Sequence, residues 1–448
     1  MKHDRFQLPR GARVLAVALM LGMASDHGAT ASAAPVSAAP ASAPNKQLGV
    51  ASCASTLCHG SAKPLEGSSV QQNEYLTWSH FDPHSRAYRV LLEPQSRAIA
   101  RRMGLQNAHE APACLACHSD TTPPAQRGER WQLSDGIGCE SCHGGSEPWI
   151  ANHYQAPNNM HSENVGRGMR ELAAPASRGE LCIGCHVGDR NRFATHQMMA
   201  AGHPRLAFEL DTYTALWRTA GGREHYRIDA DYLRRKPIAS AIETWLTGLA
   251  QTADRTAMLV SQAPRRAGAP DLAVYNCFSC HRSMRINAWG GAADTDGLPP
   301  GSLRVQDGHA RALLALASAL NDPAAVPLRR ALRELRVAAN DAPATLPMRT
   351  RTLHDALQRV RGSLAARQWT RAEQQAALAA LTRAARSGAF ADYAAAEQAA
   401  MGMMMLLAEL DLDRSQHAQI DRLFRELAHD TQFNAARFNR SLAAAAGK

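Results

Sequence analysis

The sequence predicts a mainly α-helical protein with little regular sheet, built from two parts of different character. Two observations predict the first part. All ten cysteines fall between residues 53 and 280, and the segment around them is rich in Gly, Pro, Asn and Asp with weak hydrophobic periodicity. A third observation predicts the second part, because the chain beyond residue 301 has no cysteine and repeats a helical spacing of Leu. We therefore expect short helices and long loops, followed by a helical bundle.

The first residues are typical of a leader that is removed. A basic start containing Lys2 precedes an apolar run over residues 14–24, and small residues follow as far as Ala33. This order predicts a secretory signal peptide over residues 1–33, with an uncleaved N-terminal anchor as the alternative. The run is shorter than a spanning helix needs, and no later stretch is long and apolar enough to span. We expect an exported protein, periplasmic or beyond, without a membrane span once the leader is removed.

Shifts in composition divide the remainder of the chain. Residues 34–47 are a Pro/Ala/Ser tract that cannot bury a core, which predicts a flexible linker. Residues 48–289 hold all the cysteines, and residues 290–301 read as a second linker from their Gly, Asp and Pro content. Residues 302–448 predict an antiparallel bundle of four to six helices, which either forms a homo-oligomer or docks a partner.

In this last part, apolar residues recur on single helical faces. Thr370 followed by Glu373 is typical of a capping box, and Pro323 after Asp322 of a helix start. The Met-rich run at residues 401–405 favours core packing over a set of metal ligands. The predicted apolar faces are those of Leu328, Leu332 and Leu335, of Leu353, Leu357, Val360 and Leu364, and of Ile420, Leu423, Phe424 and Leu427.

The ten cysteines form five pairs, each followed at once by a histidine. Four pairs have the spacing Cys-x-x-Cys-His, and the first is stretched by two residues. This pattern attaches a c-type haem, with both sulfurs bonded to the haem and the histidine on its iron, so five covalently attached haems c are predicted. The attachment residues are Cys53, Cys58, Cys114, Cys117, Cys139, Cys142, Cys182, Cys185, Cys277 and Cys280, and the proximal iron ligands are His59, His118, His143, His186 and His281.

Two other uses of paired cysteines are less consistent with this pattern. Exported cysteines usually form disulfides, and close pairs also bind zinc, but neither explains a histidine after every second cysteine. Aromatic residues make up only 5% of the chain, which leaves room for porphyrins as apolar bulk. The formal charge of +10 includes the leader and omits the haem propionates. Because the Lys and Arg residues are dispersed, we expect redox proteins as partners and not nucleic acid.

The second axial ligand decides what each iron does. Two histidines give a low-spin electron carrier, whereas an open side gives an iron that reacts with small molecules. The segment holds eight further histidines, which is enough for every iron and leaves at least three for other roles. They are His80, His84, His109, His153, His161, His196, His203 and His225.

Several elements between residues 53 and 203 recur together in one known family. They are Trp78 followed by His-Ser-Arg-Ala at 84–87, Ala-Cys-Leu-Ala-Cys-His at 113–118, Gly-Ile-Gly-Cys-Glu-Ser-Cys-His-Gly at 136–144, His153, and Glu-Leu-Cys-Ile-Gly-Cys-His at 180–186. On these residues, about a third of the chain resembles the tetrahaem electron-carrier cytochrome c of ammonia oxidation. That family is structurally related to hydroxylamine oxidoreductase and pentahaem nitrite reductase.

The resemblance implies distal ligands for the haems of the first and third motifs. The family's histidine after the tryptophan ligates the third haem, so His84 is implied as the distal ligand opposite His143. The family's histidine after the third motif ligates the first haem, so His153 is implied opposite His59.

The resemblance implies less for the other haems. The haem of His186 would take a downstream ligand, with His203 the better choice and His196 next. The family's second haem has no second protein ligand, which would leave the iron at His118 open. No distal ligand can be carried over for the haem of His281, which the family lacks.

Two classes of function follow, and electron transfer is favoured. The alternative is a multihaem oxidoreductase whose open haem at His118 acts on hydroxylamine or on a nitrogen or sulfur oxyanion. All five proximal positions are histidine, whereas pentahaem nitrite reductases commonly have lysine at the active site. Residues available for acid–base or anion-binding work, with propionate pairing or surface charge as the simpler interpretation, are Arg190, Arg192, Arg205, Tyr154 and His161.

Overall fold

The fold is mainly α, as predicted. The computed structural model describes residues 45–155, 161–218, 223–236, 238–262, 265–266, 269–281, 298–299, 302–410, 414–428 and 432–445. The expected signal peptide and nearly all of both expected linkers lie outside these residues. The sheet among the described residues is one antiparallel pair, β1 (Arg265–Arg266) and β2 (Ala269–Pro270). Within the same residues, no helix has the length and apolar character to cross a membrane.

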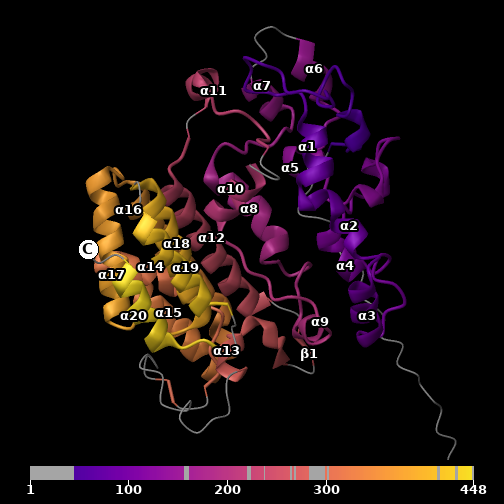
Figure 1. Cartoon of the computed structure of the whole chain (residues 1–448). Coiled ribbons are helices and arrows are strands. Elements are labelled where there is room, and N and C mark those ends of the chain that lie inside the picture. The colour runs from indigo at the N-terminus through magenta and orange to yellow at the C-terminus, as the bar shows by residue number, and fades with distance from the viewer. Residues whose placement is uncertain are drawn as a thin grey trace, which may run out of the picture. The chain divides into compact units, whose positions relative to one another are not determined.

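Short helices separated by loops make up the first part of the chain (Figure 1). This agrees with the weak periodicity and the frequent turn residues of that segment. The elements are η1 (Val50–Ser52), α1 (Glu74–Phe81), η2 (Pro83–Arg86), α2 (Ala87–Val90), α3 (Pro94–Arg102), α4 (Pro112–His118), η3 (Pro124–Gln126), η4 (Leu133–Asp135), α5 (Cys139–His143), α6 (Ile150–Gln155), α7 (His161–Gly166), α8 (Pro175–His186), α9 (His196–Ala200), α10 (Leu210–Arg218), α11 (Ala230–Arg235), η6 (Leu272–Val274) and α13 (Cys277–Cys280).

The second part consists of longer helices packed on one another. Seven α-helices are described beyond residue 302, against the four to six expected. They are α14 (Gly308–Ala319), α15 (Ala325–Asp341), α16 (Leu346–Ala365), α17 (Arg371–Arg386), α18 (Tyr393–Glu409), α19 (Arg414–Glu426) and α20 (Ala435–Ala445), with η8 (Pro343–Thr345) between α15 and α16.

One long helix, α12 (Ala241–Gln262), contacts both parts. It packs against α8 and α10 on one side and against α14, α16 and α18 on the other (Figure 1). Trp245 of α12 is fully buried, and its ring closes on Gly402 of α18, where a Cβ would lie 2.3 Å from the ring. The large core therefore begins at α12, ahead of the expected linker at residues 290–301.

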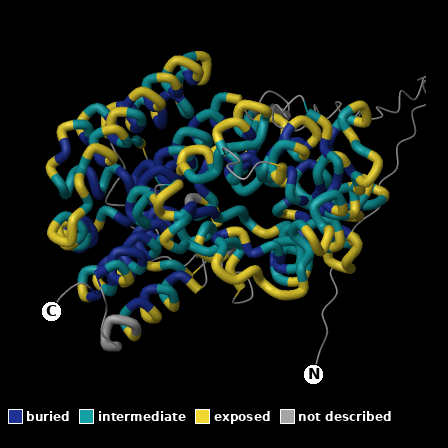
Figure 2. The backbone as a smooth tube through the Cα atoms, turned by 90° about the horizontal axis from the view of Figure 1, so that it is seen from above, coloured by how far each residue is buried: buried dark blue, intermediate teal, exposed yellow. Residues whose placement is uncertain are grey.

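The predicted helical faces form this core. Leu353, Leu357, Val360 and Leu364 are at most 1% exposed, and the other two predicted faces are also packed into it. Met403 and Met405 of the Met-rich run are buried in the same cluster, which confirms their packing role. Figure 2 shows buried backbone concentrated in these helices, while the first part is mostly intermediate or exposed.

The two predicted helix starts are confirmed in part. Thr370 caps α17 by accepting a hydrogen bond from the Glu373 amide at 3.4 Å. The Glu373 carboxylate does not return the bond to Thr370 but accepts one from Arg367 at 2.9 Å. The Asp322 side chain accepts from the Ala324 amide at 2.9 Å, and α15 begins one residue later.

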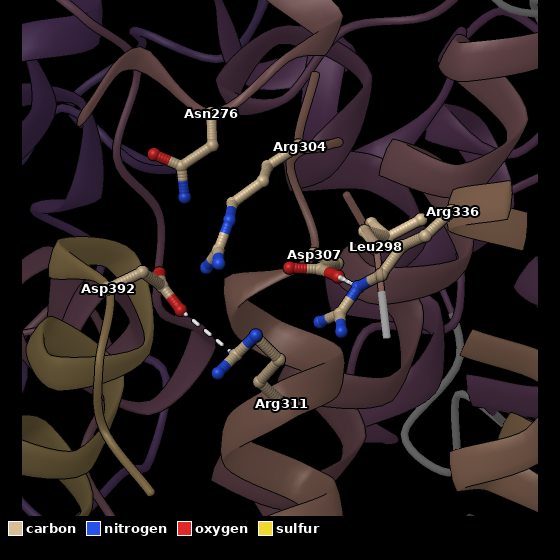
Figure 3. A pocket seen from close by; sticks show the side chains of 7 residues that line it. All are labelled: Asn276, Leu298, Arg304, Asp307, Arg311, Arg336 and Asp392. Atoms are coloured by element: carbon tan, nitrogen blue, oxygen red, sulfur yellow. Dashed lines mark hydrogen bonds and ion pairs between the residues drawn. The ribbon is translucent and has the colours of Figure 1, made fainter. Parts of the chain in front are cut away.

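Two buried ion pairs join helices of the bundle to one another (Figure 3). The Arg336 guanidinium donates to Asp307 at 2.5 Å, and Arg311 lies 3.1 Å from Asp392, with all four side chains at most 8% exposed. Burial raises the pKa of Asp307 well above its usual range. Removing either partner would leave an uncompensated buried charge, so these pairs help to fix how α14, α15 and α18 pack on one another.

Candidate haem-binding sites

Four of the five cysteine motifs are helical. The motif lies at the end of α4, forms α5, ends α8 and forms α13 with His281 as its C-cap. Cysteines three positions apart in a helix lie on one face, one above the other. Each helical motif can therefore present both sulfurs to one flat group, with the histidine following directly.

The stretched first motif is not α-helical, but it makes the same backbone hydrogen bond as the fifth motif. It follows η1, and the amide of His59 donates to the Cys53 carbonyl at 3.2 Å. In the fifth motif the His281 amide donates to the Cys277 carbonyl at 2.7 Å. The two extra residues of the first motif are accommodated in an outward loop, in which Leu57 is 85% exposed. The backbone bond between the first cysteine and the histidine is therefore present in both motifs.

None of the ten cysteines forms a disulfide. The Cys53 and Cys139 thiols lie close enough to shift each other's pKa, which places the first motif beside the third. The Cys117 and Cys185 thiols also lie close enough to shift each other's pKa, so the second motif lies beside the fourth. Burial raises the pKa of the Cys142 thiol to about 12, and the nearby Cys182 adds to it, which places the third motif near the fourth.

Each of the five motif histidines faces a second histidine from elsewhere in the chain. The ring centres are 5.9–6.5 Å apart in all five cases. The pairs are His59 with His153 at 5.9 Å, His186 with His84 at 6.1 Å, His118 with His203 at 6.3 Å, His143 with His225 at 6.5 Å, and His281 with His196 at 6.2 Å.

This spacing fits two imidazoles on opposite sides of one metal ion. With metal–nitrogen bonds of about 2.0 Å each, the ring centres of such a pair lie about 6 Å apart. Direct stacking of two rings would allow shorter separations, and no such pair of histidines approaches closer than 5.9 Å among the described residues. The residues present therefore fit an iron held between two histidines at each motif.

The pairing of His59 with His153 is the one that the resemblance implied for the first motif. Near the third motif the arrangement differs from the implied one. The Trp78 indole donates to the Ile137 carbonyl at 3.0 Å, and the Ile137 amide donates to the His84 carbonyl at 3.1 Å. Gly136, at a φ of 72°, permits this approach, because a Cβ there would lie 2.7 Å from the same carbonyl.

The His84 ring nevertheless faces His186 and not His143. The Asp82 carboxylate accepts from both the amide and the Nδ1 of His84, each at 2.9 Å, and so orients the ring. The ring opposite His143 is His225, which belongs to the loop before α11. Burial, followed by the charge of His225, lowers the pKa of His143 to about 3, so this imidazole is neutral, the form that binds a metal.

The resemblance implied that the iron at His118 has no second protein ligand. In the structure the His118 ring faces His203. The His118 Nδ1 donates to the Ala87 carbonyl at 2.9 Å, and the His203 Nδ1 to the Pro204 carbonyl at 2.8 Å. Both Nε2 atoms are thereby left for another partner. His196, the other implied choice for His186, instead faces His281.

The three remaining histidines of the segment have other neighbours. His161 lies 2.8 Å from the Glu171 carboxylate, His109 lies beside Tyr88, and His80 beside Phe81. The eight candidates thus divide into five that face a motif histidine and three that do not.

Two carboxylates that contact histidines of these pairs, Glu74 and Asp82, were not predicted from the sequence. The His59 Nδ1 lies 2.8 Å from Glu74 and the His84 Nδ1 lies 2.9 Å from Asp82. Burial alone would raise the pKa of each carboxyl, but the hydrogen bonds to the histidines and backbone amides bring both pKa values below their ordinary range. Asp82 could have been suspected from its place before Pro83 and His84, whereas Glu74 has no such local signal.

The residues considered for acid–base or anion-binding work do not gather at one place. Arg192 pairs with Asp189 at 2.9 Å, with Cys185 also 3.6 Å away, and Arg205 pairs with Glu397 at 3.1 Å. Tyr154 is 69% exposed. Ion pairing and surface exposure account for these side chains.

Comparison with known proteins bears on the first part of the chain. Residues 52–144 match the family of cytochrome c554 and c-prime, and these residues include the first three cysteine motifs. This similarity supports a c-type cytochrome with covalently bound haem c in electron transfer. No curated protein and no solved structure gave a significant match.

Proposed function

We propose that this chain is an exported pentahaem cytochrome c that carries electrons through five haems, each held between two histidines. The observation that supports it is the set of five histidine pairs at 5.9–6.5 Å, one for every cysteine motif. Export follows from the leader, and redox proteins are the partners. The C-terminal helices serve either self-association or the docking of a partner.

The chain's own residues hold the cofactors and fill both axial positions. The paired cysteines provide the covalent attachment, the motif histidine one ligand, and the facing histidine the other. When bound, the haems supply a reversible one-electron iron couple. Contacts between the first and third motifs and between the second and fourth favour transfer between neighbouring sites.

Filling of both axial positions favours a carrier over an enzyme. A reactive iron needs a position that a small molecule can reach, and the side of His118 implied to be open faces His203. The alternative, a multihaem oxidoreductase acting on hydroxylamine or an oxyanion, has less support from this arrangement.

Mass and spin state test the proposal together. We expect the mass of the intact protein to include five haems and the electron paramagnetic resonance of the ferric protein to be low-spin throughout. His203→Ala should convert one haem to high spin, because it removes the ring facing His118. His161→Ala is the matched control and should leave all haems low-spin, since His161 contacts Glu171 instead.

Two results would contradict the proposal. A haem count below five would remove the pentahaem assignment. A high-spin fraction in the wild-type protein that binds and turns over nitrite or hydroxylamine would favour the enzymatic alternative.

A further inference from the structure

Two of the five histidine pairs contain an imidazole that is bonded to a carboxylate. The His59 Nδ1 lies 2.8 Å from the Glu74 Oε2, and the His84 Nδ1 lies 2.9 Å from the Asp82 Oδ1. The two carboxylate side chains are only 13% and 7% exposed. At such burial, water screens a charge weakly, so the electrostatic interaction of each carboxylate with its histidine is stronger than that of an exposed carboxylate at the same distance.

Both carboxylates are held in place by the backbone. The second oxygen of Glu74 accepts from the Gln71 amide at 2.7 Å and from the Gln72 amide at 3.2 Å. Asp82 accepts from the amide of His84 itself. These bonds favour the ionised carboxylate and fix its direction, so the contacts to the imidazoles are part of the fold.

The pair at the second motif is different in kind. Its two rings, His118 and His203, donate from Nδ1 to the backbone carbonyls of Ala87 and Pro204. A carbonyl is a neutral acceptor, whereas a carboxylate carries a full negative charge. The charge behind the ligand therefore differs between neighbouring sites, since the second motif touches the fourth through Cys117 and Cys185.

A carboxylate that accepts a hydrogen bond from a ligand imidazole makes that imidazole a stronger donor to the metal. A stronger donor stabilises the more highly charged ferric iron and lowers the reduction potential. Building on the proposed function, we propose that Glu74 and Asp82 are positioning residues that lower the potentials of the first and fourth haems. They act through His59 and His84, and the second haem stays at a higher potential.

Two opposing charges lie near the fourth site, Arg178 near Cys182 and Arg192 near Cys185. Arg192 approaches Cys185 at 3.6 Å, and a lone cation there would raise the potential. Its charge is largely balanced by Asp189 at 2.9 Å. Asp82, in contrast, contacts the ligand ring itself at 2.9 Å, so on this proposal the fourth haem has the lower potential and passes electrons to the second.

Conservative variants of the full haem-loaded protein test this assignment. Glu74→Gln and Asp82→Asn keep the shape and an acceptor oxygen but remove the charge. In a spectroelectrochemical titration, Glu74→Gln should raise most the potential of the first haem and Asp82→Asn most that of the fourth, with every haem still low-spin. A smaller rise is expected at the third haem in both variants, because both charges also reach His225. Glu171→Gln is the matched control, because Glu171 makes the same 2.8 Å contact to His161, a histidine that faces no motif.

The outcomes separate the two proposals. Unchanged potentials in both variants, with low-spin spectra, would overturn the tuning role and leave the five-haem carrier intact. A high-spin haem in either variant would also overturn it, since the carboxylate would then be needed for ligation itself. Failure of the carrier would be visible earlier, as missing or high-spin haems in the wild-type protein.

Discussion

The segment over residues 45–240 and the helices from α12 onward are held together in different ways. The second region shares one hydrophobic cluster that runs from Ile242 to Ala445. Among its described residues, the first region has two small clusters, one around Leu91 and Ala100 and one around Ile183 and Leu210. A few apolar residues cannot offset the conformational entropy of so long a segment. The first region depends on polar contacts and, by the proposed function, on its cofactors, whereas the second is a conventional apolar core.

Removing the ten cysteines should give the largest difference between the two regions. With all ten cysteines changed to Ser, we expect residues 45–240 to lose ordered structure while α12 and α14–α20 persist. Four of the five proposed haems lie wholly in the first region and would supply folding free energy there, whereas these helices have their own apolar core. Hydrogen exchange measured by mass spectrometry checks this residue range by residue range. Equal protection of the first region in the variant and in the haem-loaded protein would contradict the expectation.

A cavity in the second region should have the next largest effect. Leu357→Ala in α16 removes a side chain that is 0% exposed, and we expect the free energy of unfolding to fall by about 2–5 kcal/mol. The haem absorption spectrum should stay unchanged, since none of the five histidine pairs includes a residue of α16. Val326→Ala, at a side chain 73% exposed, should change stability by no more than about 0.5 kcal/mol. A spectral change in Leu357→Ala would show that the two regions are not separable in this way.

A polar substitution should weaken the first region by a smaller amount. The Glu140 carboxylate accepts from the amides of Leu48, Gly49 and Ser146 at 2.7–2.8 Å and from the Ser146 hydroxyl at 2.6 Å. Glu140→Gln puts an amide donor among these donors, at a cost of about 1–3 kcal/mol.

Thermal unfolding and the exchange rates of the amides bonded to Glu140 provide the measurement. Glu147→Gln is the control, because the Glu147 side chain is half exposed and its ion pair with Lys46 is long, at 3.7 Å. Equal effects of the two variants would argue against the polar network as a source of stability.

The junction of the regions should respond to pH. His309 of α14 donates to the Phe208 carbonyl at 3.2 Å, and burial, with Arg205 adding to it, lowers the pKa of His309 to about 4. The unfolded chain therefore binds the proton more readily, and this contribution to stability is lost as pH falls from about 6.5 towards 4.

Between pH 7 and pH 5 we expect His309 to account for about 1–2 kcal/mol of lost stability. His309→Gln, which keeps a donor for the carbonyl, should show a smaller drop in melting temperature over this range than the wild type. Parallel pH profiles would rule His309 out as the cause.

The features that could be predicted from the sequence are those that depend on residues close to one another along the chain. The cysteine spacing, the buried faces such as Leu353 and Leu357, and the Thr370 cap all follow from residues within one or two helical turns of each other. Which histidines face each other is decided over much longer distances. His84 lies beside the third motif through its backbone, as the resemblance implied, but Asp82 orients its ring to the fourth.

The core boundary could not be predicted for a related reason. The sequence break at residues 290–301 is compositional, whereas α12, well before it, packs on both sides. Trp245 finds its place only because Gly402, far along the chain, has no side chain. Neither residue indicates the other in the sequence.

The histidine pairs also impose an order on how the protein is built. Each pair joins positions more than 80 residues apart, and the later members are His153, His186, His203, His225 and His281. A chain emerges during synthesis from its N-terminus, so no pair can close before His153 has appeared. By then the motifs ending in His59, His118 and His143 are all complete. The nascent chain therefore passes through a stage with three complete cysteine motifs and not one closed histidine pair.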